Sequence, residues 1–142
     1  MPLKQSSLID IQPLFGGQNL FLNSNGDIIA EIVRMREKIK CKRYKFNVPK
    51  SKINEFKDLL NEHNFPKIDI PERAGVPDEA RPKIKIILND GSKWTKSKWA
   101  NDKHEDFDKI YGWMLNIINE AEEKYEPFYK GSFEYNWRPE GF

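Results

Sequence analysis

Two short segments have the composition of tight β-turns, and each lies between two runs of residues typical of β-strands. The turn Asn25-Gly26 separates the runs 19–23 and 28–33, and the turn Asp90-Gly91 separates the runs 83–88 and 92–99. Asn-Gly and Asp-Gly tolerate the positive backbone φ that two-residue hairpin turns require, so both segments predict β-hairpins. Because the two strands of a hairpin are antiparallel, the sheet that contains them is expected to be mainly antiparallel.

A third strand is predicted over residues 37–48, but its apolar residues do not keep to one side. Cys41 has one parity along the strand, whereas Tyr44 and Phe46 have the other. A β-bulge inserts one extra residue and reverses the alternation. A bulge near Lys42-Arg43 would therefore bring both sets of apolar residues onto one face.

Two segments have the periodicity of amphipathic helices. Residues 52–63 carry one apolar stripe, and Ser51 is in position to cap that helix. The second helix is predicted over 103–124, with Asp102 as N-cap and Glu105 as the capping-box acid. Its apolar residues follow the helical period over several turns: Phe107, Ile110, Tyr111, Met114, Ile117, Ile118 and Ala121.

These elements follow one another as β-β-β-α-loop-β-β-α, which predicts an α+β fold. We expect a mainly antiparallel sheet of about five strands with two helices packed on one face. The opposite face is then expected to be polar. The whole chain, 1–142, is predicted to be a single domain, in which 1–17 form an N-terminal segment that ends in a turn.

The C-terminal tail, residues 125–142, is unusually aromatic. A disordered tail would be poor in aromatic residues, and Phe133, Tyr135 and Trp137 alternate as in a short strand. We therefore expect the tail to fold back onto a sheet edge or the core; an arm that anchors a partner or a second subunit is the alternative. It holds seven of the 18 aromatic residues: Tyr125, Phe128, Tyr129, Phe133, Tyr135, Trp137 and Phe142.

Composition makes several classes of protein unlikely candidates. The one cysteine cannot form an internal disulfide, and one cysteine with two histidines does not supply the four ligands of a structural zinc site. No uncharged apolar run is long enough to cross a bilayer. The N-terminus lacks the pattern of a signal peptide, so a cytoplasmic location is expected. Nothing in the sequence indicates a cofactor.

No catalytic motif is evident in the sequence. It contains no Gly-x-Ser-x-Gly elbow, no P-loop and no Gly-x-Gly-x-x-Gly fingerprint. Cys41 could act as a nucleophile with His63 or His104, although a thiol in mid-strand is more simply a buried apolar group. We therefore assign no catalytic residue and no metal ligand.

The segment 64–82 is predicted to be a long loop stiffened by four prolines. Loops of this length are uncommon in compact domains and are often functional. One interpretation is a recognition loop, and the other is a loop whose charged side chains brace one another over a sheet edge. The candidate partner-binding residues are Arg73, Asp78, Glu79 and Arg81.

Cations alternate along the third predicted strand and would form a row on one face. Arg36, Lys38, Lys40 and Lys42 are spaced two apart, which makes them candidates for anion binding. Solvated edge lysines that prevent sheet aggregation are the simpler interpretation. Further lysines on the last two predicted strands would extend the basic face: Lys83, Lys85, Lys93, Lys96 and Lys98.

These features favour a non-enzymatic binding domain that acts through contact with a protein partner of unknown identity. An inhibitor or immunity-type protein is one form, since complementary charge accelerates encounter. Nucleic-acid binding through a basic sheet face is the first alternative, although the net charge of +2 is modest. An enzyme with an unrecognised site is the second. The sequence does not indicate an oligomeric state.

Overall fold

A computed structural model describes residues 2–142 and shows one antiparallel sheet with two helices. The α+β class and the two helices agree with the prediction, but the sheet has seven strands and not about five. The elements, in chain order, are β1 (Leu3–Gln12), β2 (Gly16–Asn23), β3 (Asp27–Arg34), β4 (Cys41–Asn47), α1 (Lys50–Glu62), a 3₁₀ turn (Phe65–Lys67), β5 (Lys83–Leu88), β6 (Lys93–Ser97), α2 (Glu105–Lys124) and β7 (Tyr129–Gly131).

The strand order in the sheet is β6-β5-β1-β2-β3-β4-β7, so the first strand of the chain lies inside the sheet. β1 was not predicted, because its buried positions hold Ser6, Ser7 and Asp10 as well as Leu8. Polar residues at buried positions remove the alternation by which a strand is recognised. β1 pairs with β2 on one side and with β5 on the other.

Both predicted hairpin turns are confirmed. Asn25-Gly26 lies between β2 and β3, and Asp90-Gly91 lies between β5 and β6. Gly26 has a φ of +89°, and a Cβ at this position would lie 2.2 Å from the carbonyl oxygen of Val48. Glycine is therefore required both by the backbone conformation and by the close approach of the next segment.

The predicted bulge in the third strand is wrong. β4 pairs with β3 in an unbroken register from Cys41 opposite Val33 to Asn47 opposite Asp27. Cys41 and Tyr44 therefore point to opposite faces, and both are buried because both faces of β4 are covered. The apolar residues of this segment change parity along the strand because both faces of β4 are buried.

The predicted row of cations along one face of a strand is also wrong. Arg36, Lys38 and Lys40 lie in the loop that joins β3 to β4, where the backbone N–H of Arg34 donates to the carbonyl of Lys40. The chain needs these residues to reverse direction, so they cannot extend a strand. Lys42 alone is in β4 and is half-buried.

Both helices are confirmed, but neither predicted cap is. α1 begins after Pro49 without a side-chain cap, so Ser51 does not have this role. At α2, the Nδ1 atom of His104 accepts from the backbone N–H of Phe107 at 3.2 Å. Asp102 is instead held by Arg73, at 2.9 Å from its Nε atom.

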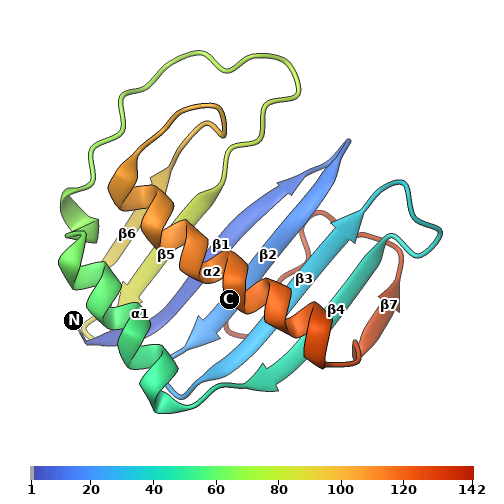
Figure 1. Ribbon diagram of the computed structural model, residues 1–142, viewed down its shortest axis with the longest axis horizontal. Coiled ribbons are helices and arrows are strands. Elements are labelled where there is room, and N and C mark those ends of the chain that lie inside the picture. Colours follow the sequence, from blue (N-terminus) through green and yellow to red (C-terminus); the bar gives the residue numbers. More distant parts are fainter. Residues whose placement is uncertain (1) are drawn as a thin grey trace.

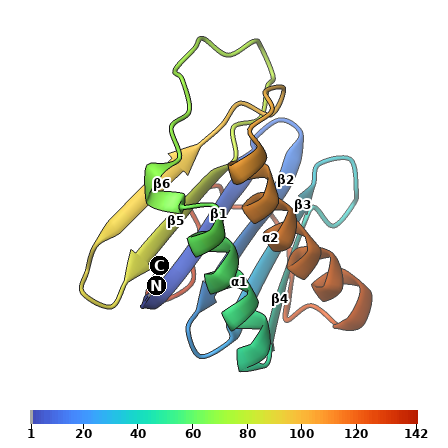
Figure 2. The same ribbon diagram turned by 60° about the vertical axis from the view of Figure 1, so that its left-hand side comes forward.

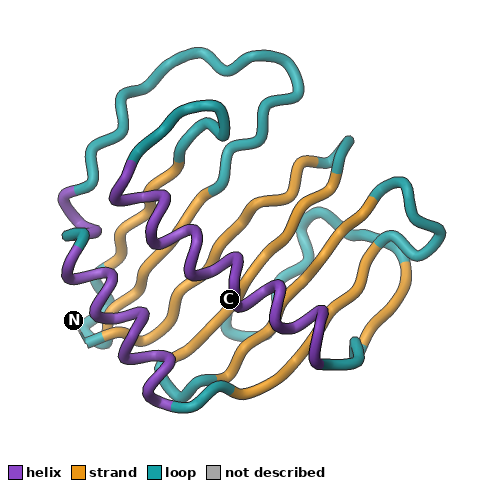
Figure 3. Tube along the Cα trace, viewed as in Figure 1, coloured by secondary structure: helices purple, strands orange, loops and turns teal. Residues whose placement is uncertain are grey.

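The helices lie side by side on the same face of the sheet (Figures 1 and 2). The main core is the layer between them and the strands, where Leu8, Leu20 and Ile84 meet helix residues. Phe56 of α1 packs against Trp113 of α2 with ring centroids 4.7 Å apart. The long loop between α1 and β5 extends beyond the end of the sheet (Figure 3).

The tail, residues 125–142, runs across the other face of the sheet (Figure 1). Its short strand β7 pairs with β4, with Tyr129 opposite Arg43. The rings of Trp137 and Phe142 pack edge-on against Phe21, with centroids 6.2 and 5.3 Å away. β7 precedes Phe133, Tyr135 and Trp137 in the chain, whereas the strand was predicted from the alternation of those three residues. The second face is consequently not the uniformly polar surface that was expected.

Replacing Phe56 with alanine tests the helix–sheet layer. The Phe56 ring is fully buried, so Phe56→Ala is expected to lower the free energy of unfolding by about 3–5 kcal/mol. Phe15→Ala is the control, because the Phe15 side chain is 59% exposed and its loss is expected to cost under ~0.5 kcal/mol. Urea denaturation followed by circular dichroism measures both; equal losses would contradict this packing.

Candidate functional site

The sheet face opposite the helices, here called the tail face, is built from residues of one parity on each strand. The pairing register places two rows across it, because residues opposite one another in a ladder share a face. The first row is Lys83, Ile9, Asn19, Glu31, Arg43 and Tyr129. The second row is Lys85, Ser7, Phe21, Ile29 and Lys45.

A buried ion pair lies in the first row. The Nε atom of Arg43 donates to Glu31 at 2.8 Å, and the two side chains are 7% and 1% exposed. The Nδ2 atom of Asn19 donates to the other Glu31 oxygen at 3.0 Å. The Cys41 thiol lies 3.5 Å from the Glu31 carboxylate, and burial, with that negative charge, raises the pKa of Cys41 to about 11. Cys41 is thus a neutral thiol at pH 7.

The tail covers this ion pair with aromatic rings. The guanidinium of Arg43 lies between the rings of Tyr129 and Trp137, 4.3 and 3.8 Å from their centroids. Such cation–π contacts contribute about 2 kcal/mol when desolvated. The Nη2 atom of Arg43 is buried and has no hydrogen-bond partner within residues 2–142. The aromatic rings therefore replace the water that this end of the guanidinium has lost.

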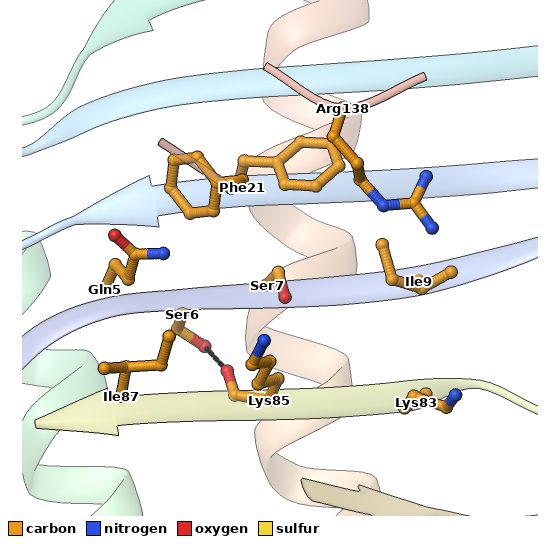
Figure 4. A pocket seen from close by; sticks show the side chains of 10 residues that line it. Gln5, Ser6, Ser7, Ile9, Phe21, Lys83, Lys85, Ile87 and Arg138 are labelled. Carbon is orange, nitrogen blue, oxygen red and sulfur yellow. Dashed lines mark hydrogen bonds between the residues drawn. The ribbon is translucent and has the colours of Figure 1, made fainter. Parts of the chain in front are cut away.

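Beside the tail, over β1 and β5, lies a groove of about 220 Å³ that we call the basic groove. Lys83 and Lys85 come from β5, and Arg138 extends from the tail toward Ile9 of β1 (Figure 4). Its lining includes no acidic side chain among the described residues, and its other side chains are polar or apolar: Gln5, Ser6, Ser7, Ile9, Phe21, Ile87 and Phe142.

The cations of this groove are free to meet a ligand. Within residues 2–142, neither Lys83 nor Lys85 makes an ion pair, and the Nη1 atom of Arg138 donates only to backbone carbonyls, at 2.7 Å to Trp137. A neighbouring hollow, also about 220 Å³, shares Lys83 with the basic groove and adds Arg81 from the long loop. Four cations thus line one side of the tail face.

Two of the four predicted loop residues, Arg73 and Glu79, are engaged with each other. Arg73 donates to Glu79 at 2.6 Å and to Asp102 at 2.9 Å, and the indole N–H of Trp99 donates to the Arg73 carbonyl. A Cβ on Gly75 would lie 2.4 Å from the Trp99 ring, so the loop backbone lies directly on this ring. The structure thus brings Arg73 and Glu79 together in a brace around Trp99.

Arg81 and Asp78 lie outside the centre of this brace. Arg81 contacts Glu72 at 3.1 Å, stacks over Trp99 at 4.9 Å and also lines the hollow next to the basic groove. Asp78 is exposed, with a left-handed φ of 67°. Of the four predicted loop residues, Glu79 and Arg81 line the hollow next to the basic groove.

The alternation of Lys83 and Lys85 with buried isoleucines indicated correctly that both face away from the core. Two other predicted members of the basic face are elsewhere: Lys96 shares the helix face with Ile84, and Lys98 is buried beyond β6, 2.6 Å from Asp108. Arg138 was missed, because no local pattern in the tail indicates what it will lie beside.

No family model, curated protein or solved structure matches this chain significantly. Neither helix within the described residues is long and apolar enough to cross a membrane. Among residues 2–142, no group of three or more His, Cys, Asp or Glu side chains could hold a metal ion.

Removing one member of the buried Arg43–Glu31 ion pair is expected to lower the stability of the fold strongly. Glu31→Gln leaves the Arg43 charge buried without a counter-charge, which is expected to lower the free energy of unfolding by about 3–5 kcal/mol. The control is Glu122→Gln, which breaks the half-exposed Arg34–Glu122 pair and should cost at most about 1 kcal/mol. A double variant, Glu31→Gln with Arg43→Met, should recover part of the loss. Chemical denaturation distinguishes these outcomes, and a mild effect of Glu31→Gln alone would refute the assigned pairing.

The loop brace predicts a particular dependence of stability on pH. Hydrogen bonds from Arg73 and from backbone amides lower the pKa of Glu79 from 4.5 to about 2. A lowered pKa in the folded state gives stability that is present above pH 4.5 and is lost as the pH falls toward 2. The melting temperature of Glu79→Gln should therefore lie below that of the wild type at pH 7, and the gap should close by pH 2.

The matched control for the brace is Glu72→Gln, because the Glu72 side chain is 83% exposed. Its melting curve should follow that of the wild type at every pH. Thermal denaturation at pH 7, 4 and 2 makes the comparison, and a gap for Glu79→Gln that stays constant with pH would contradict the brace.

Proposed function

We propose that this protein is a non-enzymatic binding domain whose basic groove holds an acidic segment of a partner protein. The observation that carries the proposal is the convergence of Lys83, Lys85 and Arg138, cations without a carboxylate partner, on one groove over the sheet. Three cations that the fold already gathers at one place favour recognition of a carboxylate-bearing ligand.

The lining of the groove favours a protein over a nucleic acid. Ile9, Ile87 and Phe142 line the groove together with the cations, which suits the mixed chemistry of a peptide. The net charge of +2 is also small for a domain that binds nucleic acid.

An inhibitor or immunity-type protein is one role that such a face would serve. A protein of this kind masks a partner by direct contact, and complementary charges raise the rate of encounter. The rigid sheet would act as the recognition surface, and the brace around Trp99 would keep Arg81 beside it.

The test is a charge reversal in the groove, with a control of equal charge. A fluorescein-labelled hexaglutamate peptide is titrated with the wild type, with Lys83→Glu/Lys85→Glu and with Lys67→Glu/Lys109→Glu. The groove variant is expected to bind at least about tenfold more weakly, a loss of about 1.4 kcal/mol, and wild-type binding should weaken as salt rises. The control lysines are exposed and lie outside the groove, so their reversal should change affinity less than about threefold.

Two results would overturn the proposal. An equal loss in both variants would show that the peptide senses only net charge. Displacement of the peptide by a single-stranded oligonucleotide, with the oligonucleotide bound more tightly at physiological salt, would favour a nucleic-acid partner instead.

A further inference from the structure

A second and larger groove lies on the tail face, at the end nearest the turn between β2 and β3. It has a volume of about 770 Å³, within the range of small-ligand sites. We call it the aromatic groove, because five of its lining residues are aromatic. They are Phe21, Phe46, Phe128, Trp137 and Phe142.

Phe128 is the most exposed of these rings, at 55% of its surface. Its backbone N–H donates to the carbonyl of Arg43 at 2.8 Å, which fixes the start of the tail against the sheet. The ring is thus held at the groove while much of it remains in water. The ring adds exposed apolar surface next to the half-buried side chains of Trp137 and Phe142.

The polar end of the aromatic groove is a carboxylate held in place. Asp27 accepts from the Nδ2 atom of Asn23 at 3.0 Å and from the Nδ2 atom of Asn47. Asn23 is itself fixed, because its Oδ1 atom accepts from the backbone N–H groups of Asn25 and Asp27 at 3.0 and 3.1 Å. These side-chain hydrogen bonds lower the pKa of Asp27, so it is ionised at neutral pH. Each carboxylate oxygen keeps a lone pair for a ligand.

The charges of the groove favour a cationic ligand. Asp27 and Glu140 contribute two carboxylates, against one ammonium from Lys45. Aromatic faces also attract cations, and guanidinium groups stack on them more readily than ammonium groups do. The same face already shows this preference, since Arg43 lies between Tyr129 and Trp137.

We propose that the aromatic groove binds an arginine side chain of a partner protein. The aliphatic part and the guanidinium plane lie along the aromatic rings, and the guanidinium forms charge-assisted hydrogen bonds with Asp27. Lys45, which lines the same groove, opposes this binding. The site is separate from the basic groove in its charged residues and does not depend on the proposed function.

The experiment uses two probes that differ in charge and hardly in shape. Nα-acetyl-arginine methylamide and its citrulline counterpart are titrated into the full chain, and the indole N–H resonance of Trp137 is followed by NMR. The arginine probe is expected to produce a saturable shift with at least fivefold higher affinity than the citrulline probe. Equal responses would overturn the proposal.

Variants then assign the contacts. Asp27→Asn should weaken the arginine probe at least fivefold, whereas Lys45→Gln should strengthen it. Phe128→Ala keeps the carboxylate and removes an exposed ring, so it should weaken binding in a folded protein. Lys83→Glu/Lys85→Glu should leave the affinity for the arginine probe unchanged, which separates this site from the basic groove. Retained affinity in both Asp27→Asn and Phe128→Ala would refute the proposal.

Discussion

The guanidinium of Arg43 is the group on which the tail face depends. It pairs with Glu31 in the sheet and lies between Tyr129 and Trp137 of the tail, so one side chain joins the strands to the segment that covers them. A buried ion pair contributes little to stability by itself, because both charges lose their water. Its consequence here is geometric: the pair and the rings fix where the tail crosses the sheet.

The position of the tail creates both grooves. Phe21 and Phe142 line both, so the packed tail forms the boundary between them. On one side, Lys83, Lys85 and Arg138 make a basic surface; on the other, Asp27 lies beside exposed and half-buried aromatic rings. Taken together, the two proposed sites describe a partner protein that presents both acidic and basic side chains.

Local patterns predicted much of the fold. The turns at Asn25-Gly26 and Asp90-Gly91, the two helices and the strands that flank the turns depend on residues only a few positions apart. The same reasoning failed for β1, whose buried Ser6 and Asp10 conceal a strand, and for β4, where burial on both faces resembled a bulge. The candidate loop residues Arg73 and Glu79 proved to bond to each other, and no local pattern could show that.

By itself, the sequence determined which segments become helices and hairpins, and that the C-terminal residues are too aromatic to remain in water. Only the tertiary structure decided that β1 lies inside the sheet, that Arg138 lines one groove with Lys83 and Lys85, and that Phe128 lines another with Asp27. The physical reason is the distance along the chain over which each kind of interaction acts. Backbone propensity and side-chain period act over a few residues, whereas the grooves are formed by side chains that are far apart in the chain and are brought together by strand register and burial.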